Sequence, residues 1–276
     1  MQKHSICAYA LDMLPAATRL IIKVIIVRIL FIGDIVGTRG VDFVVSHLNS
    51  IRKLNKIDFC IANGENSSPA GKGITKDAAA RLFMCGVDLI TLGNHAFNHN
   101  DVFALMEEEK VIRPLNFPKV VDGQGFMEID NLAVINVSGR VYLDNLDCPF
   151  ARTEEALQKI SAKTIIVDFH GEATSEKRAF AEYFDGKVSA VIGTHTHVQT
   201  ADETILKNGT AFITDAGMTG AKDSILGVRK EEVINMFLTG LPTRFAVMDG
   251  PVLMNCVIVE TDKDGKAVSI ERLNLE

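Results

Sequence analysis

The chain has 276 residues, of which 47 % are apolar and 23 % are charged. This composition indicates a globular protein that can bury one large core or two smaller ones. Its formal net charge of −6 argues against a polynucleotide bound on a basic surface, because such binding requires Lys and Arg to neutralise phosphates. A phosphate-bearing ligand would need positive charge from another source.

The cysteines indicate a reducing, cytoplasmic environment. Their number is odd, no C-x-x-C pair occurs, and two of them lie within apolar runs. Such residues are expected to be inert buried thiols rather than disulfide partners.

One strongly apolar run near the amino terminus reads RLIIKVIIVRILFIG, over residues 19–33. Lys23 and Arg28 interrupt it, and it is too short for a comfortable membrane span. A secretory signal is disfavoured, because Asp12 lies where its apolar segment should be and no small-x-small cleavage site follows. We expect the first core strand at 28–33. Residues 1–27 are then an N-terminal extension, or the result of a start assigned too early.

From residue 28 onward, apolar runs alternate with helical patterns. The runs have the length and the flanking Gly, Asn or Asp of buried strands, and they occupy residues 28–33, 58–63, 88–93, 132–137, 164–169 and 189–194. Helix spacing predicts helices over 41–54, 75–86, 153–163 and 175–184, the second starting at a capping Thr75 and stopping at Gly86. This alternation predicts an α/β fold with largely parallel strands.

The carboxyl-terminal part has a different pattern. Residues 244–250, 252–262 and 266–273 read as strands with no helix between them, which predicts antiparallel strands on a second sheet. No linker, repeat or low-complexity segment is visible, so we expect residues 28–276 to form a single domain.

Polar side chains follow five of the predicted strands. Because the carboxyl ends of parallel strands share one edge of a sheet, these groups should converge there. Singly, each has an ordinary explanation, such as a helix cap, a turn or a hydrogen-bonded core histidine. Together, carboxylates, amides and imidazoles without a thiolate suit hard or borderline divalent metal ions, and two ions that share a bridging carboxylate would use seven ligands. The eight residues are Asp34, Glu65, Asn66, Asn94, His95, His170, His195 and His197.

The segment GTHTHVQTAD, residues 193–202, contains two of these histidines on either side of one threonine. An H-x-H pair alone is a weak metal signal, because a surface turn can also contain it. On an extended segment, however, alternation would point His195 and His197 in the same direction. The pair could then serve two neighbouring ions.

Residues 28 to about 272 resemble the calcineurin-like metallophosphoesterase superfamily, and within that superfamily they resemble the bacterial YmdB-like phosphodiesterases. The resemblance is carried by the motifs GDIVG, NGEN, LGNH, DFHGEATSEK and GTHTHVQTAD. It implies a four-layer α/β/β/α sandwich of the metallo-dependent phosphatase type. One departure matters: most of the superfamily has a histidine where this chain has Val36, so one metal ion loses an imidazole.

The resemblance also implies roles for the polar residues. The first metal ion would take Asp34, Glu65 and His197, whereas His95 would be a proton donor and not a ligand. The expected cofactors are two divalent metal ions, most readily iron or manganese, with zinc or magnesium as alternatives. The second ion would share Glu65 as the bridge and take Asn66, Asn94, His170 and His195.

These parts predict hydrolysis of small cyclic nucleotides, with 2′,3′-cyclic nucleotides implied by the resemblance. Two cations about 3.5 to 4 Å apart bind phosphoryl oxygens and hold a bridging hydroxide, which attacks phosphorus. Against Asp34, Glu65 and one hydroxide they leave a charge of about +1, which matches a singly charged diester. As an imidazolium, His95 protonates the leaving ribose oxygen.

Two other functions stay open. One is a phosphomonoesterase or nucleotidase of the same superfamily, and the other is a non-catalytic regulatory protein whose metals shape a binding surface. The expected partner is a small phosphodiester, with no stable nucleic acid or membrane contact and a homo-oligomer as an option. Gly-rich loops at 66–75 and 215–227 should frame the mouth of the site, where Thr219 and Lys222 are candidate substrate contacts, although ordinary surface loops explain them more simply.

Overall fold

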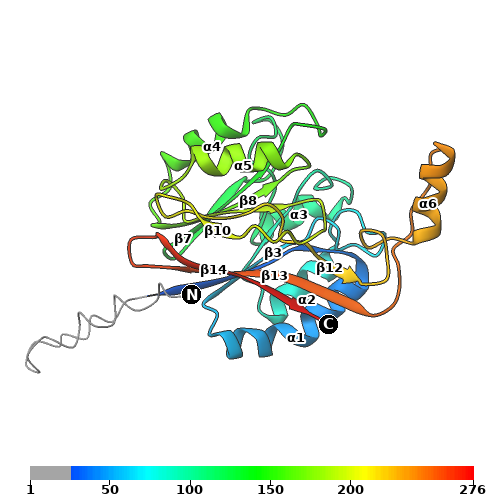
Figure 1. Cartoon of the computed structure of the whole chain (residues 1–276). Coiled ribbons are helices and arrows are strands. Elements are labelled where there is room, and N and C mark those ends of the chain that lie inside the picture. The colour runs from blue at the N-terminus through cyan, green and yellow to red at the C-terminus, as the bar shows by residue number, and fades with distance from the viewer. Residues whose placement is uncertain (1–25) are drawn as a thin grey trace, which may run out of the picture.

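A computed structural model describes residues 26–276, and it contains two β-sheets that pack face to face with helices on both outer faces (Figure 1). The four-layer α/β/β/α arrangement expected from the resemblance is confirmed. The predictions made for residues 1–25 lie outside the described residues. The first strand starts at Val27, which pairs with Thr261, so Val27 belongs to the sheet and not to the extension.

The first sheet contains both parallel and antiparallel strand pairs. Its first, third, fourth and fifth strands run parallel to one another, whereas the strand beside the first runs antiparallel to it. In spatial order the strands are β2 (Asp34–Ile35), β12 (Met218–Ala221), β13 (Val252–Thr261), β1 (Val27–Ile32), β3 (Phe59–Asn63), β4 (Leu89–Thr91) and β5 (Val111–Ile112), with β14 (Ala267–Leu275) paired to β13.

The second sheet is parallel in its centre and antiparallel at both edges. Its central strands are buried along their whole length, as expected for parallel strands covered on both faces. In spatial order the strands are β10 (Thr204–Ile205), β11 (Ala211–Ile213), β9 (Ala190–Thr194), β8 (Thr164–His170), β7 (Leu132–Ser138) and β6 (Phe126–Ile129).

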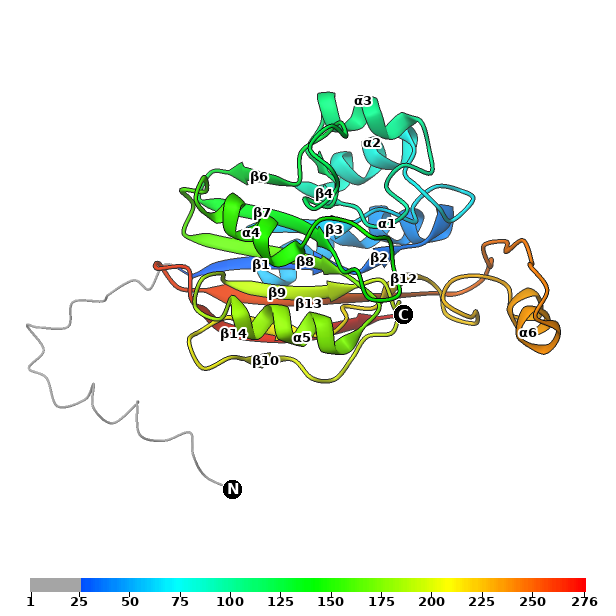
Figure 2. The same cartoon turned by 90° about the horizontal axis from the view of Figure 1, so that it is seen from above.

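The helices cover the outer faces of the two sheets. On the first sheet lie α1 (Gly37–Asn55), α2 (Lys76–Cys85) and α3 (Asp101–Glu108), and on the second lie α4 (Pro149–Leu157) and α5 (Thr174–Tyr183) (Figure 2). Thr75 and Gly86 cap α2 as predicted, with the Thr75 hydroxyl accepting from the Ala78 amide at 3.2 Å. The fourth helix lies earlier than expected, because Pro149 favours a helix start.

Strand alternation divides the apolar residues among three cores. In β1, Ile29 and Phe31 lie between the two sheets, whereas Leu30 and Ile32 face the helices of the first sheet. A third core lies between β7, β8 and the helices α4 and α5. These three cores hold both sheets in place, and with them the strand ends that carry the polar residues.

The expectation for the carboxyl-terminal strands is wrong in two respects. Residues 244–250 form no strand, and Val247 makes only an isolated bridge with Val228. The strands β13 and β14 are antiparallel, but β13 lies inside the first sheet, beside β1. Cys256 and Ile258 pack into one core and Val257 and Val259 into another, so both faces of β13 require cover.

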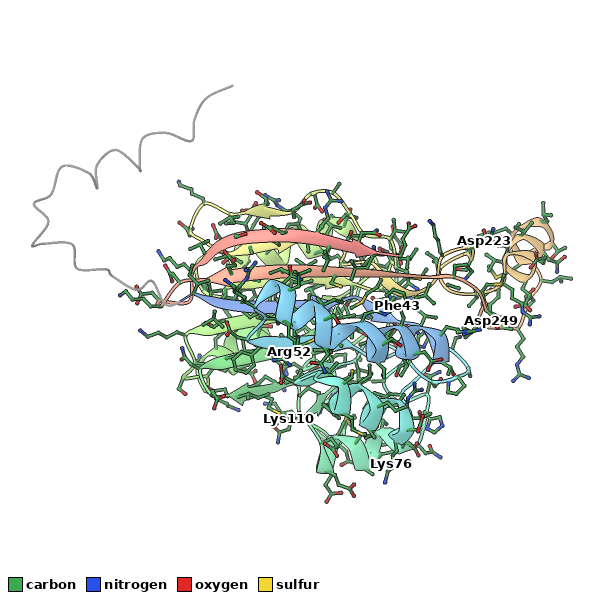
Figure 3. The ribbon with its side chains drawn as sticks, turned by 90° about the horizontal axis from the view of Figure 1, so that it is seen from below. Phe43, Arg52, Lys76, Lys110, Asp223 and Asp249 are labelled. Carbon is green, nitrogen blue, oxygen red and sulfur yellow. The ribbon has the colours of Figure 1, made fainter. Side chains whose placement is uncertain are left out.

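Residues 222–251, called here the arm, extend from the end of the sandwich and carry α6 (Lys230–Thr239), which the sequence did not predict (Figures 1 and 2). Asp223 and Asp249 lie near the two ends of the arm (Figure 3). The Asp249 carboxylate is 2.5 Å from Nε of Arg39 on α1. Among residues 26–276, no helix has the length and apolar character that crossing a bilayer requires.

Candidate active site

The polar residues predicted to converge come from the strand ends of both sheets, not from one sheet edge. Asp34 and Glu65 follow strands of the first sheet, whereas His170 ends β8 and His195 follows β9 in the second. The packing of the sheets brings the two edges together. Ligand atoms of Glu65, His170 and His195 all lie within 4.8 Å of one another.

One nitrogen of His170 is the centre of this cluster. Its Nε2 lies 3.0 Å from Oε1 of Glu65, 2.9 Å from Oδ1 of Asn94 and 3.1 Å from Nδ1 of His195. Both His170 and Glu65 are buried. These four residues, Glu65, Asn94, His170 and His195, are called the sandwich group below. Their donor atoms are those that bind borderline divalent ions.

A buried hydrogen-bond relay fixes the orientation of His170. Nδ1 of His170 donates to the Thr194 hydroxyl at 2.9 Å, and that hydroxyl donates to Asp168 at 2.7 Å. Asp168 also accepts from Thr91 at 2.5 Å and from Asn63 at 3.0 Å. Nδ1 thereby keeps its proton toward Thr194, and Nε2 is the nitrogen that faces the other ligand atoms.

The sequence prediction missed this relay. A carboxylate in the buried run TIIVDFH is a detectable signal, because an unpaired Asp is rarely enclosed by an apolar strand. The partners Thr91 and Thr194 carry no such signal, since buried threonines are common in strands.

Charges within the sandwich group are strongly coupled. Burial opposes the charged imidazolium of His170, but Glu65 and Asp34 outweigh it and raise the pKa of His170 to about 9. Burial also opposes ionisation of Glu65, yet the neighbouring His170 lowers the pKa of Glu65 to about 2. Burial, followed by repulsion from His170, lowers the pKa of His195 to about 3. A divalent cation would compete with the proton on His170 for the same carboxylate.

Asp34 and His197, called the arm group below, lie beside the sandwich group. Nε2 of His197 is 3.8 Å from Oδ1 of Asp34, and its Nδ1 is 3.0 Å from the carbonyl oxygen of Leu226 in the arm. Asp34 is fully buried, and burial raises its pKa. Within residues 26–276 its Oδ1 has no hydrogen-bond partner, and the same is true of Oδ1 of Asn66. Orphaned buried oxygens are costly, so these two atoms fit a cation that they would bind.

The segment that carries His195 and His197 is not extended, contrary to the prediction. Both residues have positive φ angles, 100° and 64°, in a bend after β9. Such backbone strain is characteristic of functional sites. Lys177 stabilises the bend, because its Nζ lies 2.8 Å from the Thr194 carbonyl oxygen and 2.8 Å from Asp215, which in turn accepts from the Thr196 amide. The two imidazoles reach the site through this bend and not through strand alternation.

Gly93 in the motif LGNH is required for the close approach of these ligands. A Cβ at this position would lie 2.4 Å from Oε2 of Glu65 and 2.4 Å from Nε2 of His170. Any larger residue would therefore displace the sandwich group.

His95 lies at the edge of the site. Its backbone amide donates to Oε2 of Glu65 at 2.9 Å, and the residue lines a cavity together with Asn66 and His197. Burial lowers its pKa. Its ring is outside the cluster of ligand atoms formed by Glu65, His170 and His195. This position suits a group that contacts substrate and leaves metal binding to its neighbours.

The remaining predicted residues are placed less favourably. Thr219 is buried in β12, and Lys222 pairs with Glu276 at the surface, at 2.6 Å. Both Gly-rich loops do reach the mouth of the site, because Gly71 and Leu226 line the cavity beside His95. Val36, where the resemblance implies a histidine in most of the superfamily, lines it as well.

Comparisons with known proteins show the family to which the chain is similar. The model of the YmdB-like protein family matches residues 30–273. Over 254 residues the chain is 45 % identical to the 2′,3′-cyclic-nucleotide 2′-phosphodiesterase of Bacillus subtilis (strain 168), covering 89 % of this chain and 96 % of that protein.

Two solved structures are similar throughout. A hypothetical protein from Thermus thermophilus has 43 % identity and a TM-score of 0.86, over 90 % of this chain and 99 % of that one. A structure described as a novel phosphatase, from Mycoplasma pneumoniae, has 32 % identity and a TM-score of 0.86, over 91 % and 94 %. The resemblance found in the sequence is confirmed: the chain belongs to the YmdB-like family of the calcineurin-like metallophosphoesterase superfamily.

Proposed function

We propose that the protein is a dinuclear metal-dependent phosphodiesterase that hydrolyses small cyclic nucleotides, with 2′,3′-cyclic nucleotides favoured. One observation carries this proposal. Ligand atoms of Glu65, Asn94, His170 and His195 converge beside the unpartnered Oδ1 of Asp34, and His95 lies next to them. The name of the Bacillus subtilis relative supports the substrate class.

The two groups of ligands correspond to two ions. The arm group, with Glu65 as the bridge, would hold the first ion, and the sandwich group would hold the second. Two such ions supply Lewis-acid stabilisation of the phosphoryl oxygens and lower the pKa of an attacking water. Oxygen and imidazole donors without thiolate favour iron or manganese, with zinc or magnesium as alternatives.

Asn66 stays a predicted ligand. The sequence assigns it to the second ion, but Asn66 lines the same cavity as His197, and its Oδ1 has no hydrogen-bond partner among the described residues. Metal analysis of an Asn66→Ala variant, with each site occupied in turn, measures which ion it binds.

His95 is the proposed general acid. As the phosphorus–oxygen bond to the ribose breaks, the electron pair goes to the leaving oxygen, which takes the proton from the His95 imidazolium. The backbone bond from His95 to Glu65 holds the residue against the ligand cluster without using its ring. Nε2 of its ring lies 3.5 Å from Nδ2 of Asn94, so the ring lies beside the ligand cluster, where it can meet the leaving group.

The test is a substrate panel with defined metals. Metal-free protein is loaded in turn with Mn, Fe, Zn or Mg and assayed on 2′,3′-cyclic, 3′,5′-cyclic and open-chain nucleoside monophosphates. We expect the largest kcat/KM on a 2′,3′-cyclic nucleotide and loss of activity with a chelator. Faster hydrolysis of monophosphates would establish the phosphomonoesterase alternative, and binding without turnover would establish the regulatory one.

A further inference from the structure

A half-open cavity extends from the candidate active site toward the arm. Its volume is about 290 Å³, close to the lower limit of about 300 Å³ for small-ligand sites. Near the strand ends it is polar, where Asn66, His95 and His197 line it. The arm supplies a second wall, which is apolar and consists of Ile225, Leu226, Val228, Val233, Met236, Phe237 and Phe245.

The helix α6 turns one face to this cavity. Val233, Met236 and Phe237 lie at positions i, i+3 and i+4, which share a helix face, and all three line the cavity. Phe237 is nevertheless 79 % exposed, so much of its ring is open. Its neighbour Leu238 is 80 % exposed but does not line the cavity. An open aromatic ring beside a polar site suits a flat ligand with one polar end.

The base of the arm is fixed to the body next to this cavity. The Val247 side chain packs against Gly37 and Gly71, where an added Cβ would come within 2.7 Å of it in each case. Val247 also bridges to Val228 across the arm. The apolar wall is therefore positioned before any ligand arrives.

We propose that this cavity binds the nucleobase of the substrate, with Phe237 and Phe245 as stacking surfaces. The inference rests on the proposed function, which places the phosphate at the metal ligands. The ribose joins phosphate to base, so the base projects from the metal ligands into the neighbouring apolar space. Every nucleobase has a π-face, and stacking on aromatic side chains accepts any of them.

The lining also predicts weak discrimination among bases. Apart from the residues already placed in the active site, Lys72 is the one charged side chain at this cavity among the described residues. Few side chains can therefore read the hydrogen-bonding edge of a base. We expect all four 2′,3′-cyclic nucleotides to be substrates, with purines preferred for their larger stacking surface.

The experiment compares Phe237→Ala with Leu238→Ala, since the two residues are adjacent on α6 and almost equally exposed. KM and kcat are measured on the four 2′,3′-cyclic nucleotides and on 1-O-methylribose 2′,3′-cyclic phosphate, which has the reacting group but no base. We expect Phe237→Ala to raise KM on the nucleotides by about fivefold or more. The base-free ester and the Leu238→Ala control should change by less than about twofold. Calorimetric titration with a nucleoside 3′-monophosphate should show the same loss of affinity without turnover.

Three results would overturn the inference. In the first, the wild-type protein prefers the base-free ester to the nucleotides. In the second, Phe237→Ala and Phe245→Ala leave KM unchanged. In the third, Leu238→Ala impairs the protein as much as Phe237→Ala does. In each of these cases the wild-type protein still hydrolyses cyclic phosphodiesters. If it hydrolyses none of them, the proposed function itself fails, so the two failures are distinguishable.

Discussion

The two ligand groups of the active site are anchored to different parts of the molecule. In the sandwich group, His170 is fixed by Thr194 and Asp168, which lie inside the second sheet. In the arm group, His197 bonds to a backbone carbonyl, that of Leu226, in a segment that extends beyond both sheets. The first group thus depends on buried side-chain chemistry. The second combines a buried carboxylate, Asp34, with a histidine whose position depends on where the arm lies.

This difference predicts unequal sites. A histidine oriented by a buried relay loses little freedom when it binds a cation, so the sandwich group should bind more tightly. The arm group should bind more weakly and respond to changes in the arm. Because the arm also forms the apolar wall of the cavity, substrate binding and occupancy of the first metal site should be coupled.

The largest expected effect distinguishes the shared ligand from an unshared one. Glu65→Gln should weaken both metal sites, because Glu65 is the proposed bridge, whereas Asp34→Asn should mainly empty the first. Elemental analysis after saturating loading should find close to two ions per chain in the wild-type protein and one in Asp34→Asn. One ion per chain in the saturated wild-type protein would contradict the dinuclear assignment.

A smaller effect is expected at His95, which lies beside both groups without being a proposed ligand. His95→Ala should keep both ions and lower kcat on a cyclic nucleotide by about two to four orders of magnitude. The loss should be far smaller on a p-nitrophenyl phosphodiester, because a phenolate leaves without needing the proton. Asn94→Ala, in contrast, should impair both substrates through metal loss. Loss of metal from His95→Ala, or equal impairment on both substrates, would exclude the role of general acid.

Much of the sandwich could be predicted because its strands and helices have strong local signals. Apolar runs such as 164–169 and 189–194 identify buried strands, and the polar residues at their ends identify the edge that carries the site. Sequence spacing could not show that the edges belong to two different sheets. The position of β13 beside β1 was also missed, because pairing over more than two hundred residues has no local signal.

The arm could not be predicted for a different reason. Its residues 244–250 have the apolar alternation of a strand, but they meet the arm itself, the loop around Gly71 and the start of α1 instead of a sheet. The bend at His195 and His197 was likewise invisible, since Lys177 and Asp215 stabilise it from distant positions. Residues that are positioned by remote partners are the ones that local patterns miss.

The buried relay behind His170 can be tested with a nearly isosteric pair of variants. Thr194→Val removes the hydroxyl that joins His170 to Asp168, whereas Thr194→Ser keeps it. We expect Thr194→Val to lower affinity for the second ion by about 10- to 100-fold. It should also destabilise the fold by about 1–3 kcal/mol, because two buried polar atoms lose a partner. Metal titration and urea unfolding measure the two effects, and a Thr194→Val variant with wild-type metal affinity would show that the relay does not orient His170.

The smallest expected effect concerns the far end of the segment that carries His195 and His197. Asp202 accepts hydrogen bonds from the backbone and hydroxyl of Thr214, which follows β11. Burial opposes its ionisation, but the Thr214 and Thr200 hydroxyls outweigh it, so the pKa of Asp202 lies below its ordinary value of 3.8. Because the pKa of Asp202 is lower in the folded protein than in the unfolded chain, its carboxylate stabilises the fold at pH values above the unfolded-state pKa. This stabilisation is lost as the pH falls through the folded-state pKa.

Asp202→Asn should therefore cost less than about 1 kcal/mol at pH 7, since the site is largely exposed. The difference from wild type, measured by urea unfolding, should shrink below about pH 4. A difference that stays constant across this range would mean that the carboxylate charge contributes nothing to holding the segment.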